Sequence, residues 1–199
     1  MNEGRIDHVC VAVLADSCAV QNLLSSTTLQ AACTGAGLQF AMTKYCLYEC
    51  LDKPRKIELP GDLEIRRRLR AARSQGLFPD HELTVEDLQE AAVLRLRRRL
   101  GAGELSSIAL AKRFHIGFQT DDDRAEKLAI DVLTRDKVQT TPHVLGWLFF
   151  HGHIGDDHVA TIIQEHTDAG RNIAARFRGM HREATRVRSL MKSAGAVEE

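Results

Sequence analysis

The chain has 199 residues, of which 44% are hydrophobic and 27% are charged, an ordinary composition for a folded domain with one well-covered core. Its formal net charge is zero, so overall charge gives no reason to expect attraction to nucleic acid. No apolar run approaches the roughly 20 residues that span a bilayer, and the N-terminal stretch MNEGRID is polar. We therefore expect a cytoplasmic protein with no membrane partner.

Hydrophobic patterning predicts short strands that alternate with helices. Residues 9–15 form a valine-rich apolar run, which is typical of a strand buried on both faces of a parallel sheet. Further strands are predicted at residues 38–42, 116–120 and 138–140. Helices are predicted at residues 18–24, 29–34, 44–51, 62–74, 84–100, 104–113, 124–133, 144–150, 156–167 and 170–191. This alternation favours an α/β fold in which helices flank a parallel sheet of about four strands.

Two segments depart from the strand–helix alternation. Residues 54–100 contain several prolines and glycines and many arginines, and we expect a helical, basic insertion there. Residues 166–199 contain a second basic helix at about 171–191, which we expect to extend the main domain of residues 1–165. The arginines of both segments fit solvated helix faces, contacts to phosphate, or a surface for a protein partner.

All five cysteines fall within the first fifty residues, and no two of them form a CxxC pair. An odd number without such a pair argues against a disulfide framework and against a zinc ribbon. We expect reduced cysteines that pack as small buried hydrophobic side chains, as they do in the cytoplasm.

Acidic residues recur where strands end and helices begin. Asp16 ends the first apolar run, Glu49 lies in the helix after the second, and Glu104 opens a helix. Residues 121–123 are three consecutive aspartates that end the run 116–120. Because the carboxyl ends of parallel strands lie along one edge of a sheet, these acids should converge. Clustered carboxylates need a cation, and oxygen ligands suit Mg²⁺ or Mn²⁺.

Each acid also has a purely structural interpretation. An aspartate at a strand–helix junction, such as Asp16 or Asp123, commonly caps the helix by accepting its free N–H groups. Glu104 is favourable at a helix N-terminus on electrostatic grounds alone. Glu49 fits a solvated acid near Lys53. The joint occurrence of the acids, in this order, favours a shared acidic site.

Several segments together resemble the PIN-domain family of small metal-dependent nucleases. The similarity covers residues 8 to about 165. It rests on the order and spacing of the segments rather than on any single motif. The segments, in chain order, are VAVLADSCAVQNLL, TKYCLYECL, GAGELSSIALAKR, IGFQTDDDRAEKLA and TTPHVLGWLFFHGHI. The resemblance implies a PIN-like three-layer fold with added helices at 62–100 and 171–191.

The resemblance also implies a function and a set of residues. PIN proteins hydrolyse RNA with Mg²⁺ or Mn²⁺, and many are toxins of toxin–antitoxin pairs. The implied catalytic residues and metal ligands are Asp16, Glu49, Glu104 and Asp122, with Asp123 as a further metal ligand. Asp121 would support these ligands or bind a second metal ion. Ser17 and Thr120 would orient a ligand or a water. Asp136 also resembles the family's acid at a strand end, but it lies too far along the chain from Glu104 for a single helix–strand unit. Expected partners are RNA, an antitoxin protein and a second copy of the chain.

The main alternative comes from a different class of protein. A chain with the same fold could act as a catalytically silent interaction or regulatory module, with the acids vestigial. The presence of all four acids favours the enzyme. A phosphatase-like or flavodoxin-like protein would need a phosphate-binding loop after the first strand, and the sequence DSCAVQNLL there has no glycine.

Overall fold

The computed structural model describes residues 6–54 and 60–195, which contain five strands and ten α-helices. Residues 55–59 of the predicted insertion, and residues 1–5 and 196–199, lie outside the described residues. The elements, in chain order, are β1 (Ala12–Ala15), α1 (Ser17–Ser25), α2 (Thr27–Gly35), β2 (Gln39–Thr43), α3 (Lys44–Leu51), α4 (Pro60–Ser74), β3 (Asp80–His81), α5 (Val85–Arg97), α6 (Ala102–Phe114), β4 (Gly117–Gln119), α7 (Asp123–Leu133), the 3₁₀ turn η1 (Arg135–Lys137), β5 (Val138–Gln139), α8 (Thr141–Phe150), α9 (Asp156–Asp168) and α10 (Ala174–Gly195).

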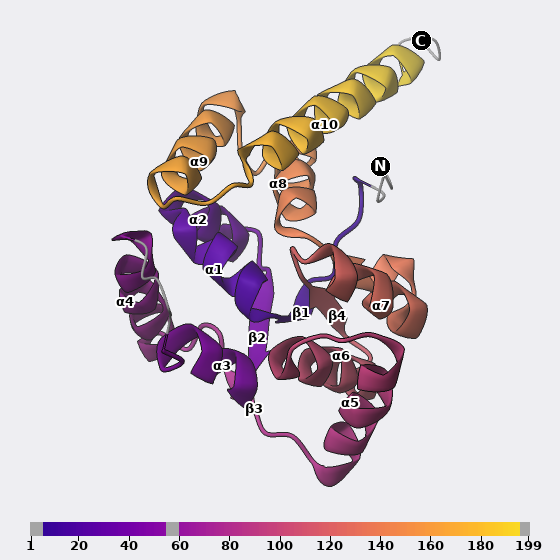
Figure 1. Cartoon of the computed structure of the whole chain (residues 1–199). Helices are drawn as coiled ribbons and strands as arrows, with labels where there is room; N and C mark the ends of the chain where they lie inside the picture. The colour runs from indigo at the N-terminus through magenta and orange to yellow at the C-terminus, as the bar shows by residue number, and fades with distance from the viewer. Residues whose placement is uncertain (1–5, 55–59, 196–199) are drawn as a thin grey trace.

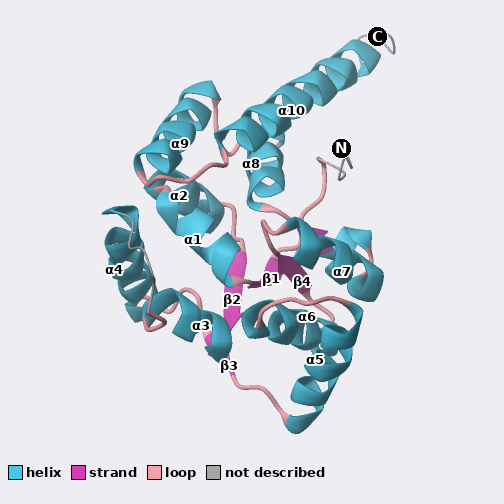
Figure 2. Ribbon diagram, viewed as in Figure 1, coloured by secondary structure: helices cyan, strands magenta, loops and turns pink. Residues whose placement is uncertain are grey.

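All five strands are parallel and form one sheet in the order β3-β2-β1-β4-β5. β1 is central, and its Val13 pairs with Phe40 of β2 on one side and with Gly117 of β4 on the other. The predicted α/β fold, with a short parallel sheet between layers of helices, is confirmed and is consistent with the PIN-like arrangement (Figure 2). β3 was not predicted, because its two polar residues carry no hydrophobic pattern.

Helices cover both faces of the sheet, and each face has its own hydrophobic core. Successive side chains of a strand point to opposite faces. Leu14 and Phe118 accordingly belong to the core under α5, α6 and α7, whereas Ala15 and Met42 belong to the core under α1 to α4. In Figure 1, α1 to α4 lie on the left of the strands and α5 to α7 on the right. The second core also includes apolar residues of α8, α9 and α10.

The added helices are present, with α4 and α5 over residues 60–74 and 85–97 where 62–100 was predicted, and with α10 at the C-terminal end. α10 packs along α8, and Ile173, Phe177 and Ala184 are buried there. Its far end then leaves the rest of the molecule (Figure 1). A buried ion pair joins Arg171, before α10, to Asp62 of α4, with Nη2 and Oδ1 3.1 Å apart. No described helix has the length and apolar character needed to cross a membrane.

The cysteines fit the expectation only in part. All five are free, and Cys33, Cys46 and Cys50 are buried. Cys18, however, is exposed, and Cys10 is half-buried. Cys18 is the second residue of α1, where the helix has just left the sheet and presents this position to solvent.

Candidate active site

The carboxyl ends of β1 and β4 meet at the centre of the sheet. Chain connections leave β1 toward β2 and β3 on one side and return to β4 and β5 on the other. Such a reversal of strand order opens a crevice at the carboxyl ends of the two central strands, where ligands of α/β proteins bind. Asp16 directly follows β1, and Thr120, Asp121 and Asp122 follow β4. The predicted position of these acids at one sheet edge is what the topology produces.

Asp16 is the most deeply buried acid at this edge, with 1% of its surface exposed. Its Oδ1 accepts a hydrogen bond from the Ala19 N–H at 2.8 Å and so caps α1. Its Oδ2 accepts from the Thr120 hydroxyl, whose own oxygen accepts the Asp122 N–H at 3.1 Å. The pKa of Asp16 is raised to about 7. Burial is the largest cause, and the charges of Asp121 and Glu104 act in the same direction, against the two hydrogen bonds.

Glu49 and Glu104 bring their carboxylates to one place over the N-terminus of α6. A methyl group built on Gly101 would lie 3.2 Å from Oε2 of Glu104 and 3.9 Å from Oε1 of Glu49. A methyl group on Gly103 would lie 2.6 Å from Oε2 of Glu49. The two carboxylates therefore flank the same short stretch of backbone, and glycine leaves the room that they occupy.

Each glutamate is also held by hydrogen bonds. Glu49 accepts the Ser17 hydroxyl on Oε2 at 2.6 Å and the Lys53 ammonium on Oε1 at 3.2 Å. Glu104 accepts the Gly101 N–H on Oε2 at 2.6 Å. Burial raises the pKa of Glu104, and the charges of Asp122 and Glu49 raise it further, while Lys53 lowers it. The charge of Glu104 acts in turn on Asp16, and we call Asp16, Glu49, Glu104 and Asp122 together the carboxyl-end cluster.

The three consecutive aspartates point in three directions. Oδ1 of Asp122 accepts the Arg124 and Ala125 N–H groups at 2.8 and 2.9 Å, so Asp122, rather than Asp123, caps α7. Asp123 is exposed at the surface of the molecule. Asp121 turns away to bind the N–H and hydroxyl of Thr141, at 2.9 and 2.6 Å, and the side-chain amide of Asn22, at 2.7 Å.

Several residues at this edge were not singled out from the sequence. Asn22 and Thr141 fix Asp121, yet nothing in their local sequence marks them, because their partner is 99 residues away in one case and 20 in the other.

Ser17 and Thr120 were expected to orient a ligand or a water, and each donates its hydroxyl proton to a carboxylate of the cluster. Asp136 lies before β5, at the opposite end of the strands.

The donor atoms of the cluster suit Mg²⁺ or Mn²⁺ in kind, since hard cations prefer carboxylate oxygens. Among the described residues, however, no three His, Cys, Asp or Glu side chains are grouped so that they could hold a metal ion. Both oxygens of Asp16 and of Glu49 accept protein hydrogen bonds, as does one oxygen each of Glu104 and Asp122. A bound ion would have to compete with these contacts.

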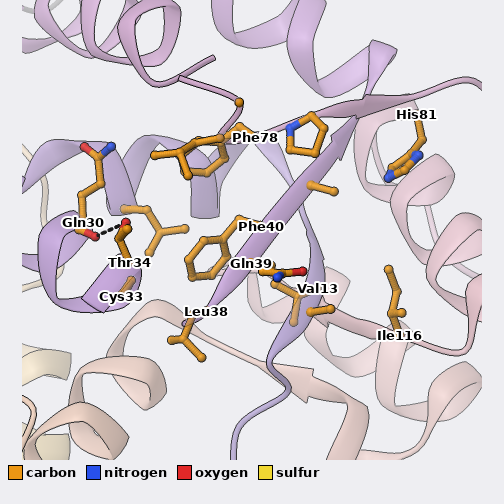
Figure 3. A pocket seen from close by; sticks show the side chains of 16 residues that line it. Val13, Gln30, Cys33, Thr34, Leu38, Gln39, Phe40, Phe78, His81 and Ile116 are labelled. Atoms are coloured by element: carbon orange, nitrogen blue, oxygen red, sulfur yellow. Dashed lines mark hydrogen bonds between the residues drawn. The ribbon is translucent and has the colours of Figure 1, made fainter. Parts of the chain in front are cut away.

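A cavity lies elsewhere, at the amino ends of β1, β2 and β3. It has a volume of about 380 Å³, and none of the described residues that line it is Asp, Glu, Lys or Arg. Phe40 and Phe78 face each other across it (Figure 3), with ring centroids 5.9 Å apart. Gln30, Thr34 and His81 add a few polar groups to this amino-end cavity. The lining of this cavity is mostly apolar, and the cavity is separate from the carboxyl-end cluster.

Comparison with protein-family models, with curated proteins and with solved structures found no match to this chain. Its function has to be inferred from the residues themselves.

Proposed function

We propose that this chain is a metal-dependent endoribonuclease that hydrolyses RNA phosphodiester bonds at the carboxyl-end cluster. The observation that carries the proposal is the convergence of Asp16, Glu49, Glu104 and Asp122 at the crevice between β1 and β4. Burial and the neighbouring acids raise the pKa of Asp16 and of Glu104 there. Burying like charges together is unfavourable unless a cation is present to neutralise them. The resemblance to PIN domains assigns the same four acids to catalysis.

The cluster would hold Mg²⁺ or Mn²⁺ through Asp16, Glu49, Glu104 and Asp122, with Asp123 as a further ligand. When bound, the ion lowers the pKa of a coordinated water and neutralises charge on the reacting phosphate. The protein's own part is orientation. The hydroxyls of Thr120 and Ser17 fix the carboxylates of Asp16 and Glu49, and Lys53 keeps Glu49 at the edge of the cluster.

We further propose that the enzyme is the toxin of a toxin–antitoxin pair, works in the cytoplasm and forms a homodimer. The resemblance supports the toxin and its antitoxin partner. Exposed apolar side chains on α5, namely Leu88, Val93 and Leu96, support a protein partner surface, because large apolar side chains gathered on one helix favour an interface.

A catalytically silent interaction module is the second candidate, and one observation favours it. Asp16, Glu104 and Asp122 accept backbone N–H groups at helix starts, and no metal-binding group is found among the described residues. An acid cluster that serves only to cap helices would have the same hydrogen bonds as a catalytic cluster without its metal ion.

Cleavage of a mixed pool of structured RNA, with Mg²⁺ or Mn²⁺ added, separates the two candidates. We expect wild type to cleave, and Asp16→Asn or added chelator to reduce the rate about 100-fold or more. Asp136→Asn is the matched control, since it makes the same change in an exposed acid at the other end of the strands. A folded wild type that cleaves nothing with either ion would support the silent module.

A further inference from the structure

An arginine from the C-terminal helix stands beside the carboxyl-end cluster. Nη1 of Arg176, in the first turn of α10, donates a hydrogen bond to the backbone carbonyl of Asp121 at 3.1 Å. The same nitrogen lies 4.0 Å from Oδ1 of Asp123. Arg176 and Asp121 are 55 residues apart in sequence, so only the packing of α10 brings a cation to this edge.

The backbone that carries Arg176 is firmly anchored. Its neighbour Phe177 is fully buried and makes an edge-on contact with the buried His166 ring, with centroids 4.7 Å apart. Ile173 is also buried, and its carbonyl accepts the Arg176 N–H at 3.0 Å. The other partner is equally fixed, because the Asp121 side chain is held by Asn22 and Thr141.

The guanidinium itself remains accessible. The side chain of Arg176 is 41% exposed, and its ion pair with Asp123, which is 79% exposed, is long. Exposed pairs of this kind contribute little to stability. Only Nη1 has a protein partner among the described residues. Since a guanidinium carries five N–H donors, the others are left to bind the oxygens of a phosphate.

Two other cations near the cluster already pair with a carboxylate. Lys53 is 56% exposed, and its ammonium pairs with Glu49 at 3.2 Å. Arg171 is only 15% exposed and pairs with the buried Asp62. An RNA strand that approaches this acidic edge meets like charge, so it needs a cation that can reach its phosphates beside the cluster. Arg176 is both accessible and fixed in position.

We propose that Arg176 is a substrate-positioning residue that binds a phosphate of the RNA strand next to the carboxyl-end cluster. This inference depends on the proposed ribonuclease function and deepens it by naming a contact to the substrate. Arg176 does not touch the reacting atoms, so its loss should weaken binding of the substrate more than it slows the chemical step.

The test compares Arg176→Ala, Arg176→Lys and Arg178→Ala. Arg178 is an exposed arginine two residues along the same helix, so its variant makes the same chemical change on another side of α10. For cleavage of one defined single-stranded RNA, we expect Arg176→Ala to raise KM about 10-fold while kcat changes less than KM. Arg176→Lys should recover part of the loss, and Arg178→Ala should match wild type.

Binding of the same RNA, followed by fluorescence anisotropy over a series of salt concentrations, gives an independent readout. Loss of one phosphate contact should reduce the slope of log affinity against log salt by about 0.7 for a single strand. A purely structural role in α10 would not produce that change. Equal KM and equal slope for Arg176→Ala and Arg178→Ala would overturn the inference.

The two proposals fail in different ways. If wild type binds RNA with an Arg176-dependent slope but cleaves none, the ribonuclease proposal fails and the phosphate contact stands. If wild type cleaves RNA and Arg176→Ala does so with unchanged KM and slope, the contact fails and the ribonuclease stands. Absence of both cleavage and binding would overturn both.

Discussion

The two ends of the parallel sheet are built from different kinds of residue. At the carboxyl ends, four acids converge with hydroxyls and a lysine around the crevice between β1 and β4. At the amino ends of β1, β2 and β3, mostly apolar side chains line a cavity of about 380 Å³, with no Asp, Glu, Lys or Arg among its described residues. This cavity is therefore not where the acids lie. Buried acids at strand ends cost stability, and buried apolar side chains at strand ends contribute to it.

The strongest test of this contrast is Phe78→Ala at the amino-end cavity. Phe78 is 3% exposed and stacks on Phe40, and removal of a buried phenylalanine ring costs about 3–5 kcal/mol. We expect a loss of that size in the free energy of unfolding, measured by denaturant titration. RNA cleavage by the folded variant should not change. Phe114→Ala is the control, since Phe114 is 40% exposed. A loss of cleavage in folded Phe78→Ala would break the separation of the two ends.

The next test is the pH dependence of stability in Asp16→Asn. The folded-state pKa of Asp16 is raised from 3.8 to about 7. Between these values the folded chain keeps a proton that the unfolded chain has released, so the group's contribution to stability falls as pH rises and is least above pH 7. Asparagine carries no such charge. We expect the variant to be more stable than wild type at pH 8, by up to about 4 kcal/mol, with the difference gone near pH 4.

Thermal unfolding across that pH range measures the effect. Asp136→Asn serves as the control of opposite sign, because the Thr134 hydroxyl lowers the pKa of Asp136. A variant Asp16→Asn that is less stable than wild type at pH 8 would show that the hydrogen bonds of Asp16 outweigh its burial.

The smallest expected effects come from one matched pair of glycine substitutions. A methyl group on Gly117, at the amino end of β4, would lie 2.5 Å from Cβ of Cys10 and 2.7 Å from Cγ1 of Val13. We expect Gly117→Ala to lose about 1–3 kcal/mol of stability through overpacking, with cleavage unchanged. Gly103→Ala should change stability by less than about 1 kcal/mol, because alanine favours a helix and the nearest atom belongs to a flexible side chain.

For Gly103→Ala the expected change is in activity. The new methyl group would displace the Glu49 carboxylate, which lies 2.6 Å from its position. We expect cleavage to fall roughly 10- to 100-fold, as misplaced catalytic groups do. Denaturant titration and cleavage rates of both variants, measured side by side, check the pair. The same activity loss in both would argue against a site at the carboxyl ends.

The sequence predicted the fold well where hydrophobic runs were long enough to read. The runs around Val13, Phe40 and Phe118 predicted the three central strands, and because parallel strands share an edge, the position of the acids followed. β3 had no such signal. Its two residues, Asp80 and His81, form a strand only because Met42 and Thr43 lie beside them.

The direction in which each side chain points could not be predicted from the sequence. Asp121, Asp122 and Asp123 are chemically identical neighbours, and their different roles are set by Asn22, Thr141 and the start of α7. Arg176 was one of many arginines on a predicted helix. Its place beside Asp121 depends on how α10 packs on α8, which no local pattern specifies.

The central position of β1 also has a consequence for the newly made chain. The hydrogen bond between Thr120 and Asp16 joins residues 104 positions apart, and contacts of such separation form only after a long stretch of chain has been closed into a loop. Most of the chain must therefore be synthesised and leave the ribosome before β4 can pair with β1 and complete the cluster. The nascent chain carries Asp16 and Glu49 from early on, yet it has no assembled acid site until synthesis is well past the middle.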